Sequence, residues 1–388
     1  MMKPVYRWIF ICLGMLLCLE ARAQYVVGTR GDGSVATVPY SFDTDIRAIR
    51  DNAFPNFHNP YGDYIQWGPA LLIPTLKAFG VPTRGNWGRL LSAAAISAAL
   101  TGGVSWGLKN WVGRERPNLA DSKSFPSGHV ITAFCSAHIL HKEYGWYSPW
   151  ISVAGYTLAM ATAVQRVATD WHWMSDTFGA AALGIGCVEL GYFLNGLIWG
   201  DKGYCGKFNP RAHFHYEPEA FDYYTIEWLY GRRFMLGSQD DINASVKPWR
   251  GGVAALQAEL PWTRGALGTT APGAEGMIPM SSGIKVRLGA QSLTHKDGTS
   301  YNIYNALVGG YWSLAIMTWF ETEAYAMIGG DWNAQGGGLD TDLGLSANFI
   351  TGGAFKLKLF AEFEAFKLHR EKPFFASFLL GYSAGFYF

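Results

Sequence analysis

The chain of 388 residues is close to electrically neutral, with 31 basic and 30 acidic residues, and 49% of its residues are apolar. The balanced charge argues against a nucleic-acid-binding protein, which would carry a clear basic excess. Charged residues make up only 16% of the chain, whereas about 25% is usual for soluble domains. The composition therefore predicts a protein that works at a membrane.

The first 23 residues predict a signal peptide. Two basic residues precede the apolar stretch Trp8–Leu19, and Ala21 and Ala23 then form an A-x-A pattern. The apolar stretch is shorter than the roughly 20 residues that a membrane-spanning helix needs. We therefore expect cleavage after Ala23 and export of the chain. Residues 24–59, which include YVVGTRGDGSVATVPYSF, predict an exposed extended segment.

Export leaves three of the five cysteines in the mature chain, namely Cys135, Cys187 and Cys205. An odd number at these spacings predicts neither a disulfide framework nor a metal site. We expect no metal and no cofactor.

Residues 60–200 predict an all-α domain. Apolar stretches of helical length alternate there with breaks rich in glycine, proline and charged residues. These stretches cover residues 65–80, 87–108, 129–142, 150–164 and 178–199. The order predicts a helical bundle, in which the junctions between helices gather polar side chains at one end.

Three polar clusters, KNWVGRERP, PSGH and QRVATDWHWMSD, fall at these junctions. They contain Lys109 and Arg116, then Pro126 to His129, then Arg166, His172 and Asp176. Lysine and arginine donate hydrogen bonds to phosphate oxygens, and the arginine fork binds two oxygens at once. Ser127 can cap the helix that follows, whose free N–H groups from Gly128 onward then point at an anion. The clusters therefore predict an anion-binding site.

The third cluster also predicts catalysis. His172 and Asp176 are four residues apart, so on a helix the carboxylate can hold one imidazole nitrogen and leave the other free as a nucleophile. His129 then remains as the general acid for the leaving oxygen. Together these groups predict phosphoryl transfer through a phosphohistidine without a metal.

The three clusters resemble the motifs of the type 2 phosphatidic acid phosphatase superfamily, which includes bacterial class A acid phosphatases and vanadium haloperoxidases. That family has Lys, six residues, Arg-Pro; then Pro-Ser-Gly-His; then Ser-Arg, five residues, His, three residues, Asp. The resemblance implies that His172 is the nucleophile, Asp176 its orienting partner and His129 the acid. It implies a phosphate pocket made of Lys109, Arg116, Ser127, Gly128 and Arg166. Gln165 stands where the family commonly has serine, which puts a secondary phosphate contact in doubt.

Residues 223–388 predict an all-β domain, after a linker at 201–222 that is rich in Gly, Pro and His. In FKLKLFAEFEA the apolar residues share one face and the charged residues the other. Eight strand candidates suit a small closed antiparallel barrel. They lie near 223–236, 249–260, 282–292, 299–312, 314–328, 340–350, 353–366 and 374–388. The final segment, FLLGYSAGFYF, resembles the last strand of bacterial outer-membrane barrels. A soluble β-sandwich is the alternative, because alternation serves both architectures.

An exported N-terminus places the three clusters in the periplasm of a Gram-negative cell envelope. If all five helical stretches crossed the inner membrane, residue 200 would emerge in the cytoplasm, and an outer-membrane barrel could not follow. We therefore favour a periplasmic helical domain held at the outer membrane by the barrel. A helical bundle integral to the inner membrane is the alternative.

The sequence predicts a metal-independent phosphatase for a phosphorylated membrane lipid, with no nucleic acid and no obligatory protein partner. Membrane attachment concentrates enzyme and lipid on one surface. Lipid A ranks first as the substrate, followed by undecaprenyl pyrophosphate, phosphatidic acid and phosphatidylglycerol phosphate. The alternatives are a general periplasmic acid phosphatase, a vanadium-dependent haloperoxidase, and a barrel scaffold with a degenerate enzyme domain.

Overall fold

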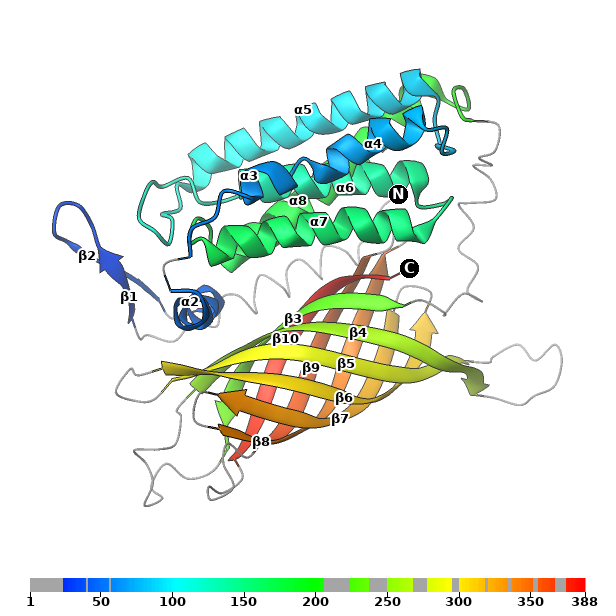
Figure 1. Ribbon diagram of the computed structural model, residues 1–388. Coiled ribbons are helices and arrows are strands. Elements are labelled where there is room, and N and C mark those ends of the chain that lie inside the picture. The colour runs from blue at the N-terminus through cyan, green and yellow to red at the C-terminus, as the bar shows by residue number, and fades with distance from the viewer. Residues whose placement is uncertain are drawn as a thin grey trace, which may run out of the picture. The chain divides into compact units, whose positions relative to one another are not determined.

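The structure, a computed structural model, describes residues 24–39, 41–55, 57–205, 224–236, 250–267, 278–294, 300–317, 320–333, 336–351, 355–366 and 375–387. The chain forms two compact units that divide between Phe214 and His215, and each is considered by itself (Figure 1). The predicted signal peptide, most of the predicted linker and the terminal Phe388 lie outside the described residues.

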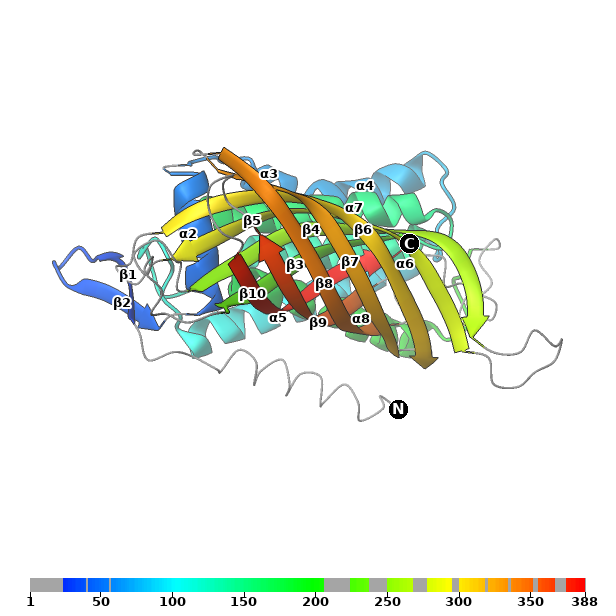
Figure 2. The ribbon, with the colours of Figure 1, turned by 90° about the horizontal axis from the view of Figure 1, so that it is seen from below.

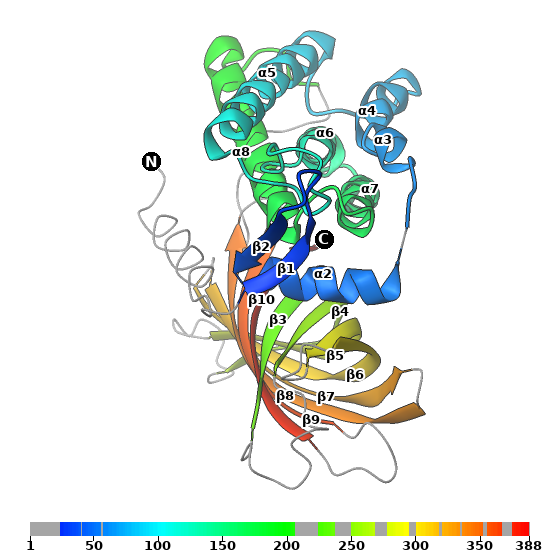
Figure 3. The same ribbon diagram turned by 90° about the vertical axis from the view of Figure 1, so that its left-hand side faces the viewer.

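The first unit begins with an antiparallel hairpin of β1 (Gln24–Thr29) and β2 (Val35–Pro39), followed by α2 (Phe42–Ala53). Helix α2 was not predicted, because residues 24–59 read as an exposed extended segment. Ile46 and Ile49 of α2 are buried, and α2 contacts α7 and α8, which are defined below. Figure 3 shows α2 lying across one end of the helical bundle.

The remaining helices confirm the predicted all-α domain. They are α3 (Gly62–Ile65), α4 (Gly68–Ala78), α5 (Trp87–Val112), α6 (Gly128–Tyr144), α7 (Pro149–Ala168) and α8 (Met174–Trp199). Helix α6 is the central one, because it contacts α4, α5, α7 and α8. Its buried Leu140 and Tyr144 pack in a core cluster with Leu90 of α5 and Val188 of α8.

The order of the helices brings the motifs together. Helices α5 and α7 end where α6 and α8 begin, so all three polar clusters meet at the end of the bundle that α2 covers. Helices α5 and α8 have 26 residues each, and by length and composition both are long and apolar enough to cross a membrane.

The second unit is a closed antiparallel barrel of eight strands, as predicted. The strands are β3 (Thr225–Met235), β4 (Arg250–Leu267), β5 (Ile278–Thr294), β6 (Ser300–Met317), β7 (Phe320–Asn333), β8 (Gly336–Thr351), β9 (Phe355–Phe366) and β10 (Phe375–Tyr387). Each strand pairs with the next along the chain, and β10 pairs with β3 to close the sheet. Figure 2 shows the strands running side by side with a common tilt. Closure excludes the open β-sandwich.

The barrel carries its charges inside and its apolar side chains outside. In β9, Lys358 and Glu362 are fully buried, whereas Phe363 is 44% exposed. Exposed apolar side chains cover the outer face of the other strands as well, among them Leu256, Trp262, Leu288, Val308, Trp312, Ile328, Leu343, Leu345, Phe378 and Leu380. A soluble barrel has the opposite arrangement, and this one is typical of barrels that sit in a membrane.

Candidate active site

His172 lies in the short connection between α7 and α8 and is 3% exposed. Its Nδ1 is 2.8 Å from the backbone carbonyl oxygen of Ser124. A carbonyl oxygen only accepts hydrogen bonds, so Nδ1 carries the hydrogen and Nε2 keeps its lone pair. Burial lowers the pKa of His172 to about 4, so the imidazole is neutral near pH 7. His172 therefore presents a neutral, nucleophilic Nε2.

The expected hydrogen bond between Asp176 and His172 is absent. The Asp176 Oδ2 atom lies 3.9 Å from Nδ1 of His172, beyond hydrogen-bonding distance. Asp176 instead accepts hydrogen bonds from the Ser124 hydroxyl at 2.5 Å and from the Trp173 backbone N–H at 3.0 Å. The prediction assumed a continuous helix, but α8 begins at Met174, so His172 precedes it. Asp176 thus acts on His172 through Ser124.

Arg114 is a site residue that sequence reasoning missed. Its guanidinium bonds Asp176 Oδ1 at 2.7 Å and the Ser175 hydroxyl at 2.6 Å, and its other terminal nitrogen bonds Asp43 Oδ2 at 2.6 Å. Asp43 lies on α2, which was not predicted, so no signal in the sequence linked it to the motifs. Arg114 therefore joins α2 to the start of α8 behind His172.

Two of the predicted phosphate-binding cations converge on Trp171. The guanidinium carbons of Arg116 and Arg166 lie 5.2 and 5.3 Å from the centre of the Trp171 ring. Arg116 also donates to the Trp171 carbonyl oxygen at 3.0 Å, and the same terminal nitrogen lies 3.1 Å from Nε2 of His172. The tryptophan thus holds two positive charges close to Nε2 of His172.

The third cation, Lys109, approaches the start of α6. Its Nζ donates to the carbonyl oxygen of Pro126 at 2.7 Å, and its Cε lies 3.9 Å from the place that a Cβ on Gly128 would take. Ser127 is the N-cap residue of α6, but its side chain makes no capping hydrogen bond, contrary to the prediction. Within the described residues, the buried Ser127 hydroxyl and the Nε of Arg166 have no hydrogen-bond partner. These two groups can receive the oxygens of an anion.

His129 pairs with a residue outside the three motifs. Its Nε2 lies 2.8 Å from Oδ1 of Asp63 on α3, and the same oxygen lies 3.4 Å from Arg166. Burial lowers the pKa of His129, the Arg166 charge lowers it further, and the Asp63 carboxylate opposes both effects. Asp63 was not predicted, because a lone aspartate in a four-residue helix forms no pattern.

Gln165 replaces the serine of the family pattern and has a structural role. Its Nε2 donates to the carbonyl oxygen of Asn59 at 2.6 Å. Its Oε1 lies only 1.9 Å from the place that a Cβ on Gly62 would take. Gln165 thus packs on the backbone immediately before Asp63, and the end of its side chain would have to move to admit a Cβ at Gly62.

A family model matches part of the helical domain. Residues 88–196 match the family model of the PAP2 superfamily, and this range contains all three motifs but neither Asp43 nor Asp63. The lipid A 1-phosphatase of Porphyromonas gingivalis is 38% identical over 180 residues, which are 46% of this chain and 40% of that protein. The chain therefore spans less than half the length of this curated relative.

Solved structures are more distant. Aquifex aeolicus LpxE is 19% identical, with a TM-score of 0.31 over 39% of this chain and 95% of that one. A transmembrane PAP2-type phosphatidylglycerolphosphate phosphatase from Bacillus subtilis is 18% identical, with a TM-score of 0.34 over 52% and 100%. The outer membrane enzyme PagL is 12% identical, with a TM-score of 0.26 over 41% and 97%.

Proposed function

We propose that the chain is a phosphatase of the PAP2 superfamily that removes phosphate from a membrane lipid through a phosphohistidine, and the family-model match of residues 88–196 and the similarity to a lipid A 1-phosphatase support this. One observation carries the proposal. The lone pair of His172 Nε2 faces a cluster of cationic side chains, with Arg116 at 3.1 Å and Arg166 on the same tryptophan ring. A neutral nucleophile beside fixed positive charges suits attack on a phosphate ester.

In the first step, Nε2 of His172 attacks phosphorus and the bond to the ester oxygen breaks. His129 gives its proton to that leaving oxygen. In the second step, water attacks the phosphohistidine, His129 takes a proton from the water, and the P–N bond breaks to release phosphate. Nδ1 of His172 keeps its hydrogen and donates it to the Ser124 carbonyl oxygen throughout, which stabilises the positive charge that forms on the ring.

The phosphate pocket is formed by Lys109, Arg116, Ser127, Gly128 and Arg166. The unpartnered Ser127 hydroxyl and Arg166 Nε support this role, because a buried donor without a partner is costly until a ligand satisfies it. Asp63 holds His129 in the free enzyme, and its negative charge favours the protonated imidazole against the burial and the Arg166 charge that lower the pKa of His129. The leaving oxygen then replaces Asp63 as the partner of the imidazole N–H.

Lipid A is the first candidate substrate. The similarity to a lipid A 1-phosphatase supports it. Exposed tryptophans on α5 support a lipid more generally, since Trp106 and Trp111 flank Lys109 and are 73% and 83% exposed. Indole rings prefer the level of lipid headgroups. Undecaprenyl pyrophosphate and phospholipid phosphates rank next.

We place the protein in the outer membrane, with the active site in the periplasm. The apolar outer face and charged lumen of the closed eight-stranded barrel support this location. Recovery of the native protein with inner-membrane markers after density separation of the two membranes would overturn it.

The activity is tested by phosphate release from lipid A, undecaprenyl pyrophosphate, phosphatidic acid and a soluble aryl phosphate, with full-length protein in detergent. We expect release from one lipid, its loss in His172→Ala, and retention in the matched variant His141→Ala, which changes a histidine of α6 outside the pocket. Release from the aryl ester alone would make the protein a general acid phosphatase. Activity that needs peroxide, halide and vanadate would make it a haloperoxidase.

A further inference from the structure

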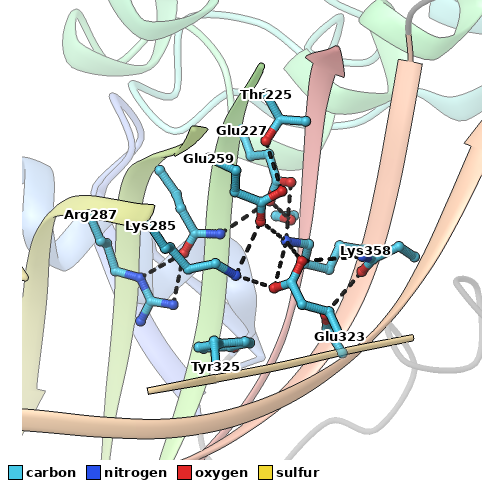
Figure 4. Close-up of polar contacts among 12 residues, drawn as sticks. Thr225, Glu227, Glu259, Lys285, Arg287, Glu323, Tyr325 and Lys358 are labelled. Carbon is cyan, nitrogen blue, oxygen red and sulfur yellow. Dashed lines mark hydrogen bonds and ion pairs between the residues drawn. The ribbon is translucent and has the colours of Figure 1, made fainter. Parts of the chain in front are cut away.

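The barrel lumen contains two groups of buried charges that differ in their balance. In the first group, glutamates and lysines pair. Lys285 contacts Glu323 and Glu259, and Lys358 contacts Glu259, Glu323 and Glu227. Figure 4 shows these side chains pointing toward one another inside the barrel. Paired charges of this kind are tolerated in a buried position.

The second group contains more carboxylates than cationic side chains. Five of them are buried there, namely Asp331, Asp340, Asp342, Glu362 and Glu364. Two arginines oppose them: Arg233 pairs with Glu364, and Arg287 pairs with Asp342 and Glu362. Within the part of the chain that the structure describes, Asp331 and Asp340 have no cationic partner.

Three of these carboxylates are close enough to share one ion. Asp340 and Asp342 on β8 and Glu364 on β9 each offer an oxygen, and these oxygens all lie within 4.8 Å of one another. Calcium binds oxygen at about 2.3–2.6 Å, so two of its ligands are separated by at most about twice that distance. The measured spacing meets this limit.

A second observation comes from the neighbouring strand β7. Asp331 is 3% exposed, and among the described residues its carboxylate forms no hydrogen bond with another side chain. In the β7–β8 register, Gly329 pairs with Asp340 and Asp331 pairs with Gly338. Asp331 and Asp340 are therefore diagonal neighbours on the inward face. Asp340 and Asp342 each keep one further unpartnered oxygen.

We propose that Asp340, Asp342 and Glu364 bind a calcium ion inside the barrel, with the buried Asp331 carboxylate beside them. The donors are all oxygens, most of them charged, which suits a hard cation and not zinc or copper. Calcium accepts irregular arrangements of six to eight oxygens, whereas magnesium demands a near-ideal octahedron that sheet positions do not provide. The ion balances the excess negative charge and ties β8 and β9 together.

The test uses full-length protein in detergent, stripped of metal with a chelator and returned to chelator-free buffer at constant ionic strength. Barrel unfolding is followed by mobility in SDS gels run without boiling, as temperature is raised with added CaCl₂, MgCl₂ or matched NaCl. We expect added calcium to raise the temperature midpoint of barrel unfolding progressively. At a calcium concentration of 100 times Kd, the folding equilibrium constant should increase about 100-fold. Magnesium has a weaker effect and sodium none. Terbium provides an independent readout, because Tyr325 bonds Glu362 beside the site and can sensitise its luminescence.

Two variants decide the assignment. The double variant Asp340→Asn with Asp342→Asn removes the excess charge, so without calcium it is at least as stable as the metal-free wild type, yet it loses the calcium and terbium responses. The matched control Glu323→Gln alters the first group, so it lowers the midpoint but keeps the calcium response.

Two results would overturn the proposal. If calcium does not change the unfolding midpoint of the wild-type barrel and lower pH raises it, then the carboxylates are protonated and hold no ion. A calcium response that persists in the double variant would place the ion elsewhere. Neither result bears on phosphatase activity, which depends on the helical domain.

Discussion

The backbone carbonyl of Ser124 accepts the Nδ1 hydrogen of His172 at 2.8 Å, while the hydroxyl of the same serine donates to Asp176 at 2.5 Å. Ser124 is fully buried and lies two residues before Pro126, the first residue of the PSGH motif. One residue thus sets the tautomer of the proposed nucleophile and links it to the buried carboxylate. The backbone N–H of Ser124 also donates to the Arg114 carbonyl oxygen at 2.9 Å, so this serine contacts the first and third motifs and lies just before the second.

Ser124→Ala separates these two roles. It keeps the carbonyl that holds His172 but leaves one acceptor of Asp176 unpaired, so we expect a stability loss of about 1–3 kcal/mol. Phosphate release should fall less than in His172→Ala, because the tautomer is retained. Denaturant unfolding and initial rates check both parts. A loss as complete as in His172→Ala would show that the hydroxyl itself takes part in the chemistry.

Asp63→Asn tests how the proposed acid is tuned. Burial and the charges of Arg166 and Arg116 lower the pKa of His129, and the Asp63 carboxylate raises it. The acid must be protonated to act, so activity is lost as pH rises through its pKa. Removing the Asp63 charge lowers that pKa further, and the alkaline limb of the kcat profile should move to lower pH.

The readout for Asp63 is the pH profile of kcat for lipid A and for an aryl phosphate with a good leaving group, which depends less on an acid. Asp32→Asn, in the exposed β1–β2 turn, is the charge-matched control and should leave the profile in place. An unchanged alkaline limb in Asp63→Asn would contradict the assigned role.

The helical domain should lose stability in mild acid because His172 is buried and neutral. Its pKa falls from an ordinary 6.5 to about 4 in the folded state, so between these values the unfolded chain binds more protons. Stability therefore decreases as pH falls from about 6.5 to 4, by roughly 3 kcal/mol in total. Urea unfolding of the helical signal across this range measures the slope, which should flatten in His172→Gln.

Gly62 and Gln165 should behave as a coupled pair. Gly62→Ala places a Cβ 1.9 Å from Oε1 at the flexible end of the Gln165 side chain, so we expect that end to move away and to give up its hydrogen bond to the Asn59 carbonyl, with a modest loss of stability. Gln165→Ser removes the obstructing group, and Gly62→Ala should then be nearly harmless. A double-mutant cycle on stability measures the coupling. Simple additivity would contradict the packing.

The helical and β domains were predictable because each produces a repeating pattern of apolar and polar residues in the sequence. Apolar stretches between polar breaks marked α4 to α8, and alternation marked all eight strands. Helix α2 was not predicted because its buried face is small, with Ile46 and Ile49 set among charged residues. Alternation alone did not show whether the apolar or the charged face of each strand points into the barrel, since either face can turn inward. Closure and burial put the charged face inside.

For the candidate site, the sequence by itself determined which chemical groups are present. The spacings of Lys109, Arg116, His129, Arg166 and His172 relative to the helix ends bring them to one end of the bundle, since neighbouring helices run antiparallel. Only the tertiary structure decided which groups touch. Asp63 reaches His129 across 66 positions of the chain and Arg114 reaches Asp43 across 71, and such contacts depend on how helices pack. The predicted direct hydrogen bond between His172 and Asp176 was wrong for the same reason. The residue at which α8 begins depends on packing and on the contacts of Ser124.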